Sequence, residues 1–108
     1  MFRHMAILKF KADATEEAKR AFLDNFPGVM NNIPEIKSWS IGRDAGGGGE
    51  SHVRSGGYPP NYDVGLMMDF DSPDAYRAYA ECEAHQKFFA EYVKPIIAER
   101  VVVQFHMK

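Results

Sequence analysis

The chain has 108 residues, of which 13 are Lys or Arg and 15 are Asp or Glu, giving a formal net charge of −2 at neutral pH. At this length we expect a single domain spanning residues 1–108, with a core that needs no disulfide to hold it together. The near balance of charge, without any run of Lys or Arg, argues against nucleic acid or an anionic membrane as a partner.

The cellular location can be inferred from the cysteine content and from the length of the apolar runs. Cys82 is the one cysteine, so no internal disulfide can form, and no Cys/His spacing typical of a zinc site is present. We therefore expect a reducing, cytoplasmic location. No apolar run reaches the length of a signal peptide or a membrane span, so we expect a soluble chain without processing.

The first segment with a clear pattern is a predicted strand at Phe2–Lys11. Apolar residues recur there at every second position, which is typical of a strand with one face in the core. His4 falls on the more apolar face, and a histidine in that position is either a core residue or part of a cavity. The same face carries Phe2, Ala6, Leu8 and Phe10.

A helix is predicted over Thr15–Asn31 from apolar residues at helical spacing. Asp13, followed three residues later by Glu16, resembles a capping box at its start. Pro27 lies inside this helix, where proline removes one backbone hydrogen bond and clashes with the preceding turn, so we predict a kink or break near Phe26.

Three further strands follow from apolar alternation, at Ile36–Arg43, Tyr62–Phe70 and Arg100–Met107. The Gly46–Gly57 segment between two of them predicts a long mobile loop. Its four consecutive glycines lack the lysine and hydroxyl residues that end a phosphate-binding loop, and they do not precede a helix.

The order of elements predicts an α+β, ferredoxin-like fold, β-α-β-β-α-β, with a four-stranded antiparallel sheet and the helices on one face. The other sheet face would then expose apolar side chains. Met5 and Ile7 are expected there, together with groups such as Trp39 or Met67 from neighbouring strands. Pairing of two such faces would bury them, which predicts a homodimer.

A second helical region is predicted over Ser72–Ala98, with Ser72 as its cap. It places Tyr79 and His85 six residues apart. Because a helix turns by about 100° per residue, an unbroken helix would put these two side chains on different faces. A break near Cys82 would instead let both line one cavity.

The chain contains several short motifs in a fixed order. They are His4 with Leu8–Lys11, Ile33–Pro34 with Ile36, Gly42–Arg43, Tyr62–Asp63, Tyr79 with His85, and Arg100–Val103. Together they resemble the stress-responsive dimeric α/β-barrel domain family, and the resemblance covers essentially the whole chain. It implies a homodimer whose two sheets close into a barrel, with a pocket in each subunit between sheet and helices.

One plant member of that family, a cyclase of linear polyketides, is similar in having a histidine early in the first strand and a tyrosine–histidine pair across the second helical region. His4, Tyr79 and His85 match these positions. The resemblance implies that His85 acts as a base with Tyr79 as its partner, and a neutral imidazole and a phenol suit those roles. Four aromatic residues are either core residues or walls of a ligand pocket, namely Phe22, Phe26, Tyr76 and Phe89.

Two other chemistries have less support in the sequence. Tyr62–Asp63 could supply a cation ligand, since some plant relatives bind magnesium, but Asp63 and Asp69 on alternate strand positions do not make an oxygen cage. Cys82 could act as a nucleophile beside His85, but no third group is evident. We therefore expect no metal and no cofactor.

The leading functional hypothesis is a homodimeric stress-responsive barrel protein that binds a small, largely apolar, oxygenated molecule. Acid–base catalysis by His85 and Tyr79 would then make it a cyclase or lyase of polyketide-like substrates. The competing hypothesis is a non-enzymatic stress or assembly protein whose cavity is filled by side chains. A third is a cofactor-free monooxygenase of the same superfamily.

Overall fold

The structure is a computed structural model that describes residues 1–45 and 62–108, so the predicted Gly46–Gly57 loop lies outside the described residues. The strands and helices follow one another along the chain in the predicted β-α-β-β-α-β order. The elements are β1 (Phe2–Phe10), α1 (Glu16–Met30), β2 (Ser38–Arg43), β3 (Val64–Phe70), α3 (Pro73–Glu81), α4 (Glu83–Phe88), the π-helical turn η2 (Phe89–Val93) and β4 (Ile97–His106).

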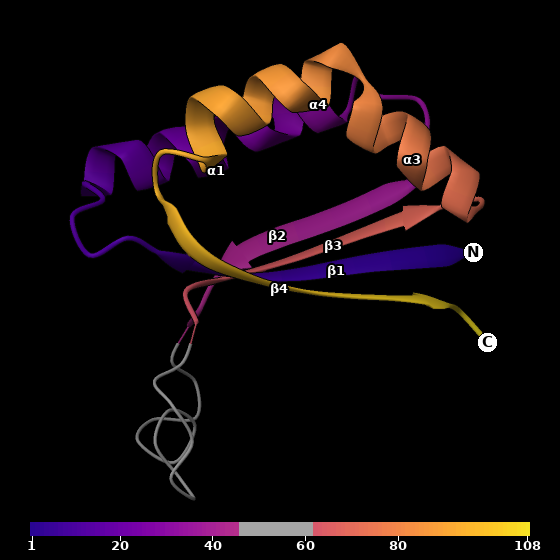
Figure 1. Cartoon of the computed structure of the whole chain (residues 1–108), viewed down its shortest axis with the longest axis horizontal. Helices are drawn as coiled ribbons and strands as arrows, with labels where there is room; N and C mark the ends of the chain where they lie inside the picture. The colour runs from indigo at the N-terminus through magenta and orange to yellow at the C-terminus, as the bar shows by residue number, and fades with distance from the viewer. Residues whose placement is uncertain (46–61) are drawn as a thin grey trace, which may run out of the picture.

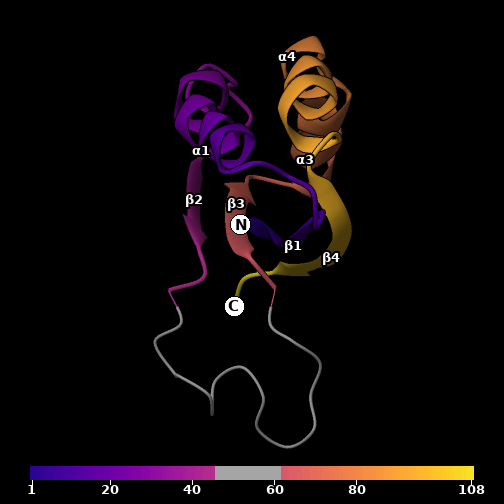
Figure 2. The ribbon, with the colours of Figure 1, turned by 90° about the vertical axis from the view of Figure 1, so that its left-hand side faces the viewer.

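The four strands form one sheet in the order β2-β3-β1-β4, and every neighbouring pair is antiparallel. All the helices lie against the same face of this sheet (Figure 1). Viewed from the end, α1 lies side by side with α3 and α4 above that face (Figure 2). The predicted ferredoxin-like α+β fold is thereby confirmed.

The core lies between the sheet and the helices. Every second residue of β1 contributes to it, as the alternation predicts, and Met68 and Phe70 of β3 are completely buried beside them. Helix α1 covers this layer with Phe22, Phe26 and Met30, which are spaced by four residues and therefore share one face.

Helix α1 differs from its prediction in two respects. Its cap is Thr15, whose Oγ1 accepts a hydrogen bond from the Ala18 amide at 3.1 Å, so the expected capping box at Asp13 is wrong. The helix also continues through Pro27 to Met30 without a break. Pro27 lies in the last turn, where the burial of the flanking Phe26 and Met30 holds the helix on the sheet.

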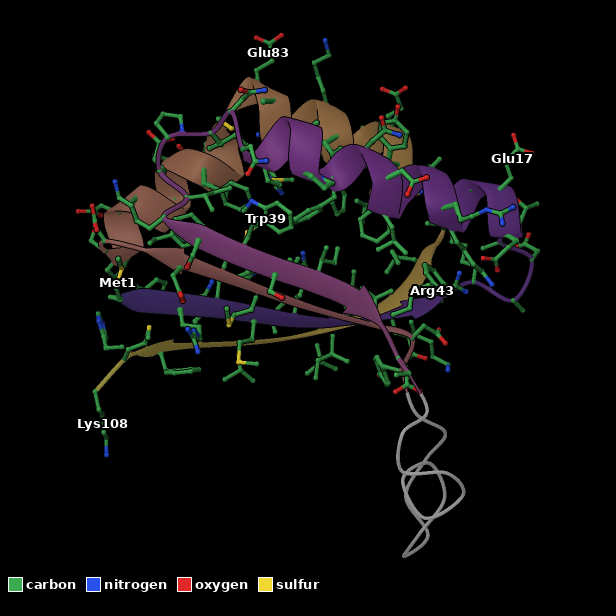
Figure 3. The ribbon with its side chains drawn as sticks, turned by 180° about the vertical axis from the view of Figure 1, so that it is seen from behind. Met1, Glu17, Trp39, Arg43, Glu83 and Lys108 are labelled. Atoms are coloured by element: carbon green, nitrogen blue, oxygen red, sulfur yellow. The ribbon has the colours of Figure 1, made fainter. Side chains whose placement is uncertain are left out.

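Trp39 faces the helices, so the expectation that it lies on the open sheet face is wrong. Its ring packs edge-on against Phe26 with centroids 5.3 Å apart, and its Nε1 donates to Oδ1 of Asn31 at 2.9 Å. The indole lies between sheet and helices (Figure 3). On this side the apolar part of the indole contacts an aromatic ring, and its N–H group has a hydrogen-bond acceptor. Strand β2 begins at Ser38, two residues later than predicted.

The last strand begins earlier than the pattern indicates. Helical structure ends at Val93 instead of continuing to Ala98, and β4 starts at Ile97, three residues before Arg100. The reason is pairing with the end of β1, where Phe10 lies opposite Ile97 and the Lys11 amide donates to the Ile96 carbonyl at 2.8 Å.

The sheet face opposite the helices carries exposed apolar side chains, which project below the sheet in Figure 3. This surface, which we call the open face, includes Met5 and Ile7 as predicted, together with Val101, Val103 and Phe105 of β4. Within the described residues, none of the helices combines the length and apolarity needed to span a bilayer.

Candidate functional site

The second helical region is divided at Cys82, as the cavity hypothesis requires. Ser72 caps α3 by accepting from the Ala75 amide at 3.2 Å. Cys82 then adopts an extended backbone, with φ −68° and ψ 150°, which ends α3 and starts α4. Its Sγ accepts from the His85 amide at 3.4 Å, so the thiol serves as the cap of the second helix.

The break brings Tyr79 and His85 together. Their ring centroids are 4.4 Å apart, with the planes tilted by 50°. Tyr76, one turn before Tyr79, stacks on His4 of β1 with centroids 4.8 Å apart. The three residues predicted to carry chemistry therefore belong to one aromatic cluster that joins β1 to the helices.

A cavity opens beside this cluster, between the sheet and the helices. Its free volume is about 80 Å³, whereas a single buried water needs about 10–15 Å³ on the same measure. The cavity therefore has room for a compact group of atoms. All seven sequence-predicted site residues line it, namely His4, Phe22, Phe26, Tyr76, Tyr79, His85 and Phe89.

Hydrogen bonds fix the proton positions on the two imidazoles. Nδ1 of His85 lies 3.0 Å from the Ala80 carbonyl oxygen, which can only accept, so this nitrogen carries the proton and Nε2 keeps a lone pair. Nε2 of Gln104 lies 2.8 Å from Nδ1 of His4 and donates to it, so His4 carries its proton on Nε2. One ring thus offers an acceptor and the other a donor.

Burial keeps all three groups neutral. Burial, with a smaller contribution from the positive charge of Arg100, lowers the pKa of His4 to about 4. Burial likewise lowers the pKa of His85, although the hydrogen bond to Ala80 acts in the opposite direction. The pKa of Tyr79 is raised, chiefly by burial, so its hydroxyl remains protonated and can donate a hydrogen bond.

The geometry gives little support to a cysteine nucleophile or to a metal site. Cys82 does not line the cavity, and its sulfur is engaged in capping. Asp63 accepts a hydrogen bond from the Phe10 amide at 2.8 Å, while the Tyr62 hydroxyl lies 3.4 Å from Glu99. In residues 1–45 and 62–108, no three His, Cys, Asp or Glu side chains group together as a metal site.

The sequence analysis missed two polar residues of the site. Arg100 lines the cavity, and Gln104 orients His4. Both alternate along β4 with Val101 and Val103, which lie on the open face, so both point toward the helices. Pairing β4 with β1 would have identified them, because Arg100 lies opposite Leu8 and Gln104 opposite His4.

The fold and cavity define an α+β protein of ferredoxin-like topology with an aromatic pocket beneath its helices. Residues 2–107 match the family described as the Stress Responsive A/B Barrel Domain, and the chain belongs to that family. The family resemblance inferred from the short motifs is confirmed. Comparison with curated proteins gave no match.

Solved structures agree with the fold over almost the whole chain. A dimeric ferredoxin-like protein of unknown function from Thermobifida fusca is 28% identical, with a TM-score of 0.79, and the match covers 98% of this chain and 90% of that one. A family member from Mesorhizobium loti is 17% identical, with a TM-score of 0.76 and coverage of 99% and 96%. The hydroxynitrile lyase from Passiflora edulis is 19% identical, with a TM-score of 0.79 and coverage of 99% and 93%.

Proposed function

We propose that the chain forms a homodimer in which each subunit binds a small, largely apolar, oxygenated molecule and carries out acid–base chemistry of the cyclase or lyase type. The observation that carries this proposal is the orientation of His85. Its Nδ1 is held by the Ala80 carbonyl, so the basic nitrogen left for a ligand is Nε2 of a neutral ring at the cavity wall.

The proposed step is a proton transfer at a ligand carbonyl. Nε2 of His85 takes a proton from the carbon next to the carbonyl, and the electrons of that C–H bond move into an enolate. The Tyr79 hydroxyl donates to the enolate oxygen, and Nε2–H of His4 is a second donor from the sheet side.

The open face supports the homodimer. Val103 of the edge strand β4 is 56% exposed on this face, and Ile7 and Phe105 are more than 40% exposed. Contiguous apolar surface of this kind is uncommon on monomers. The Thermobifida fusca protein, at 28% identity, is described as dimeric, which supports the same state here.

The size of the cavity bears on the substrate. About 80 Å³ of free space favours a compact molecule over a long polyketide chain. This volume is smaller than that of most ligand pockets, which starts at about 300 Å³, and it therefore favours a second candidate function, a non-enzymatic assembly protein. The similarity in fold to a hydroxynitrile lyase supports a lyase acting on a compact hydroxynitrile.

Solvent exchange tests the catalytic proposal. Phenylacetone in buffered D₂O at pH 7 loses its benzylic proton signals in ¹H NMR when a base removes those protons. The wild type is expected to accelerate this exchange over buffer. His85→Gln should slow the catalysed exchange by about 10²-fold or more, because general-base catalysis usually contributes that much. Tyr79→Phe should slow it less, because it removes one donor.

His106→Gln is the matched control, because His106 is an exposed histidine of β4 outside the cavity lining. It should leave the rate unchanged. Mandelonitrile cleavage, in which the base takes a hydroxyl proton, separates lyase from cyclase chemistry. If neither reaction is accelerated, or if His85→Gln matches the wild type, the acid–base proposal fails and the assembly role gains support.

A further inference from the structure

Arg100 occupies a distinctive place at the cavity. It lies near the start of β4, directly opposite Leu8 of β1. Residues opposite one another in an antiparallel pair point to the same sheet face, and Leu8 is buried beneath the helices. Arg100 therefore points toward the helix side, where it lines the cavity while remaining exposed to solvent. The guanidinium is part of the rim.

Arg100 is also the one cavity residue in the described part of the chain that is fully charged at neutral pH. Burial keeps His4, His85 and Tyr79 neutral, and the remaining lining residues are apolar apart from the phenol of Tyr76. The charge of Arg100 reaches across the cavity, because it disfavours protonation of both histidines and favours ionisation of Tyr79. A positive potential therefore extends through the space a ligand would fill.

No carboxylate among residues 1–45 and 62–108 neutralises that charge. Asp and Glu are missing from the described cavity lining, and none of the ion pairs of Arg3, Lys37, Arg43 and Arg77 involves a carboxylate near Arg100. A guanidinium has five N–H donors in a planar fork that matches a carboxylate. A second recess shares Phe89, Val93 and Arg100 with the cavity and adds Lys94 and Glu99, so cations outnumber acids there too.

We propose that the cavity selects small organic anions, with Arg100 binding a carboxylate group at the rim while the apolar body of the ligand lies among the aromatic side chains of α1 and α4. This inference rests on the ligand cavity of the proposed function and narrows its substrate class from oxygenated to anionic. Arg100 thereby determines specificity and orients the ligand with its apolar end toward Phe22, Phe26 and Phe88.

Two probes of nearly equal shape test the proposal. Benzoate and benzamide differ chiefly in charge, and isothermal titration calorimetry of the full chain at low salt measures both. Benzoate is expected to bind at least about tenfold more tightly, because a charge-assisted pair with Arg adds roughly that factor even near the surface. Chemical-shift changes of the His4 and His85 rings on addition of benzoate place the probe in the cavity.

Arg100→Gln should abolish the preference for benzoate, whereas Arg100→Lys should retain part of it. Arg20→Gln removes the same charge from an exposed position of α1, outside the cavity lining, and should leave the preference intact. Equal binding of the two probes to the wild type would overturn the selection of anions but leave the proposed function standing. A preference that survives Arg100→Gln would overturn the role of Arg100. If neither probe binds, the anion proposal and the ligand-binding part of the proposed function both fail.

Discussion

Tyr79 and His85 are six residues apart in the sequence, yet their ring centroids lie 4.4 Å apart because Cys82 between them adopts an extended backbone. An unbroken helix would turn the two side chains about 600° relative to one another, to different faces. The pairing of phenol and imidazole at the cavity therefore depends on one residue that ends α3 and starts α4.

The cap at Cys82 can be tested by substitution. Serine is a strong helix N-cap and alanine is a poor one, so Cys82→Ser is expected to be more stable than Cys82→Ala by about 1 kcal/mol in urea unfolding. In Cys82→Ser the nuclear Overhauser contacts between the rings of Tyr79 and His85 should persist. An alanine variant as stable as the serine variant would show that the sulfur does not cap α4.

Asp69 anchors a polar network on the open face. Its carboxylate accepts from Nε and Nη2 of Arg3, at 2.8 and 2.9 Å, and from the Ser38 hydroxyl at 2.9 Å, while only 6% of the residue is exposed. Asp69→Asn should lower Tm by about 4–8 °C, because the new amide would remain buried while pairing less well with Arg3 and Ser38. The control is Asp71→Asn, because Asp71 pairs with Lys37 at 3.6 Å while both side chains are exposed, so the loss of this pair should hardly change Tm.

His4 makes stability depend on pH. Burial lowers the pKa of His4 from 6.5 to about 4, so between these values the unfolded chain binds a proton that the folded chain does not. Stability from this group is present above pH 6.5 and is lost as the pH falls toward 4. From pH 7 to pH 5 the loss should be about 2 kcal/mol.

Urea unfolding of the wild type and of His4→Gln at pH 7 and pH 5 isolates the contribution of His4. The difference between the two proteins should shrink at pH 5, because only the wild type carries this histidine. An unchanged difference would mean that His4 titrates normally in the folded state and is therefore not buried in neutral form.

The open face is expected to pair two subunits. Val103→Asp places a charge at its most exposed apolar position and should convert the dimer to a monomer in size-exclusion chromatography with light scattering. Ala12→Asp adds the same charge at an exposed turn residue and should remain dimeric. A wild type that is already monomeric at micromolar concentration would contradict the proposed homodimer.

Much of this fold could be predicted from the sequence because local patterns and tertiary packing agree. Alternation in β1 correctly placed His4 on the buried face, since one apolar face per strand is enough to fix orientation. Trp39 was predicted on the wrong face because β2 is short and an indole is compatible with either face of a sheet. Its position is decided by the hydrogen bond from Nε1 to Asn31, which the sequence pattern does not indicate. The start of β4 was missed because its first residues are fixed by pairing with β1, a contact that spans most of the chain.

The candidate site was predictable only in part. Tyr79 and His85 could be singled out, but their approach depends on the backbone of Cys82, and no proline marks that break. Arg100 was overlooked because its importance lies in what surrounds it, a cavity lined by apolar and neutral groups. Such a property belongs to the assembled residues and not to any local pattern.

The most direct test of the central claim is the protonation of the His85 ring, measured by long-range ¹H–¹⁵N correlation NMR with ¹⁵N-labelled protein at pH 7. The account predicts a neutral ring with the proton on Nδ1 and an unprotonated Nε2, because Nδ1 donates to the Ala80 carbonyl and burial lowers the pKa. A His85 ring that is positively charged at pH 7, or that carries its single proton on Nε2, would contradict the assignment of His85 as the base.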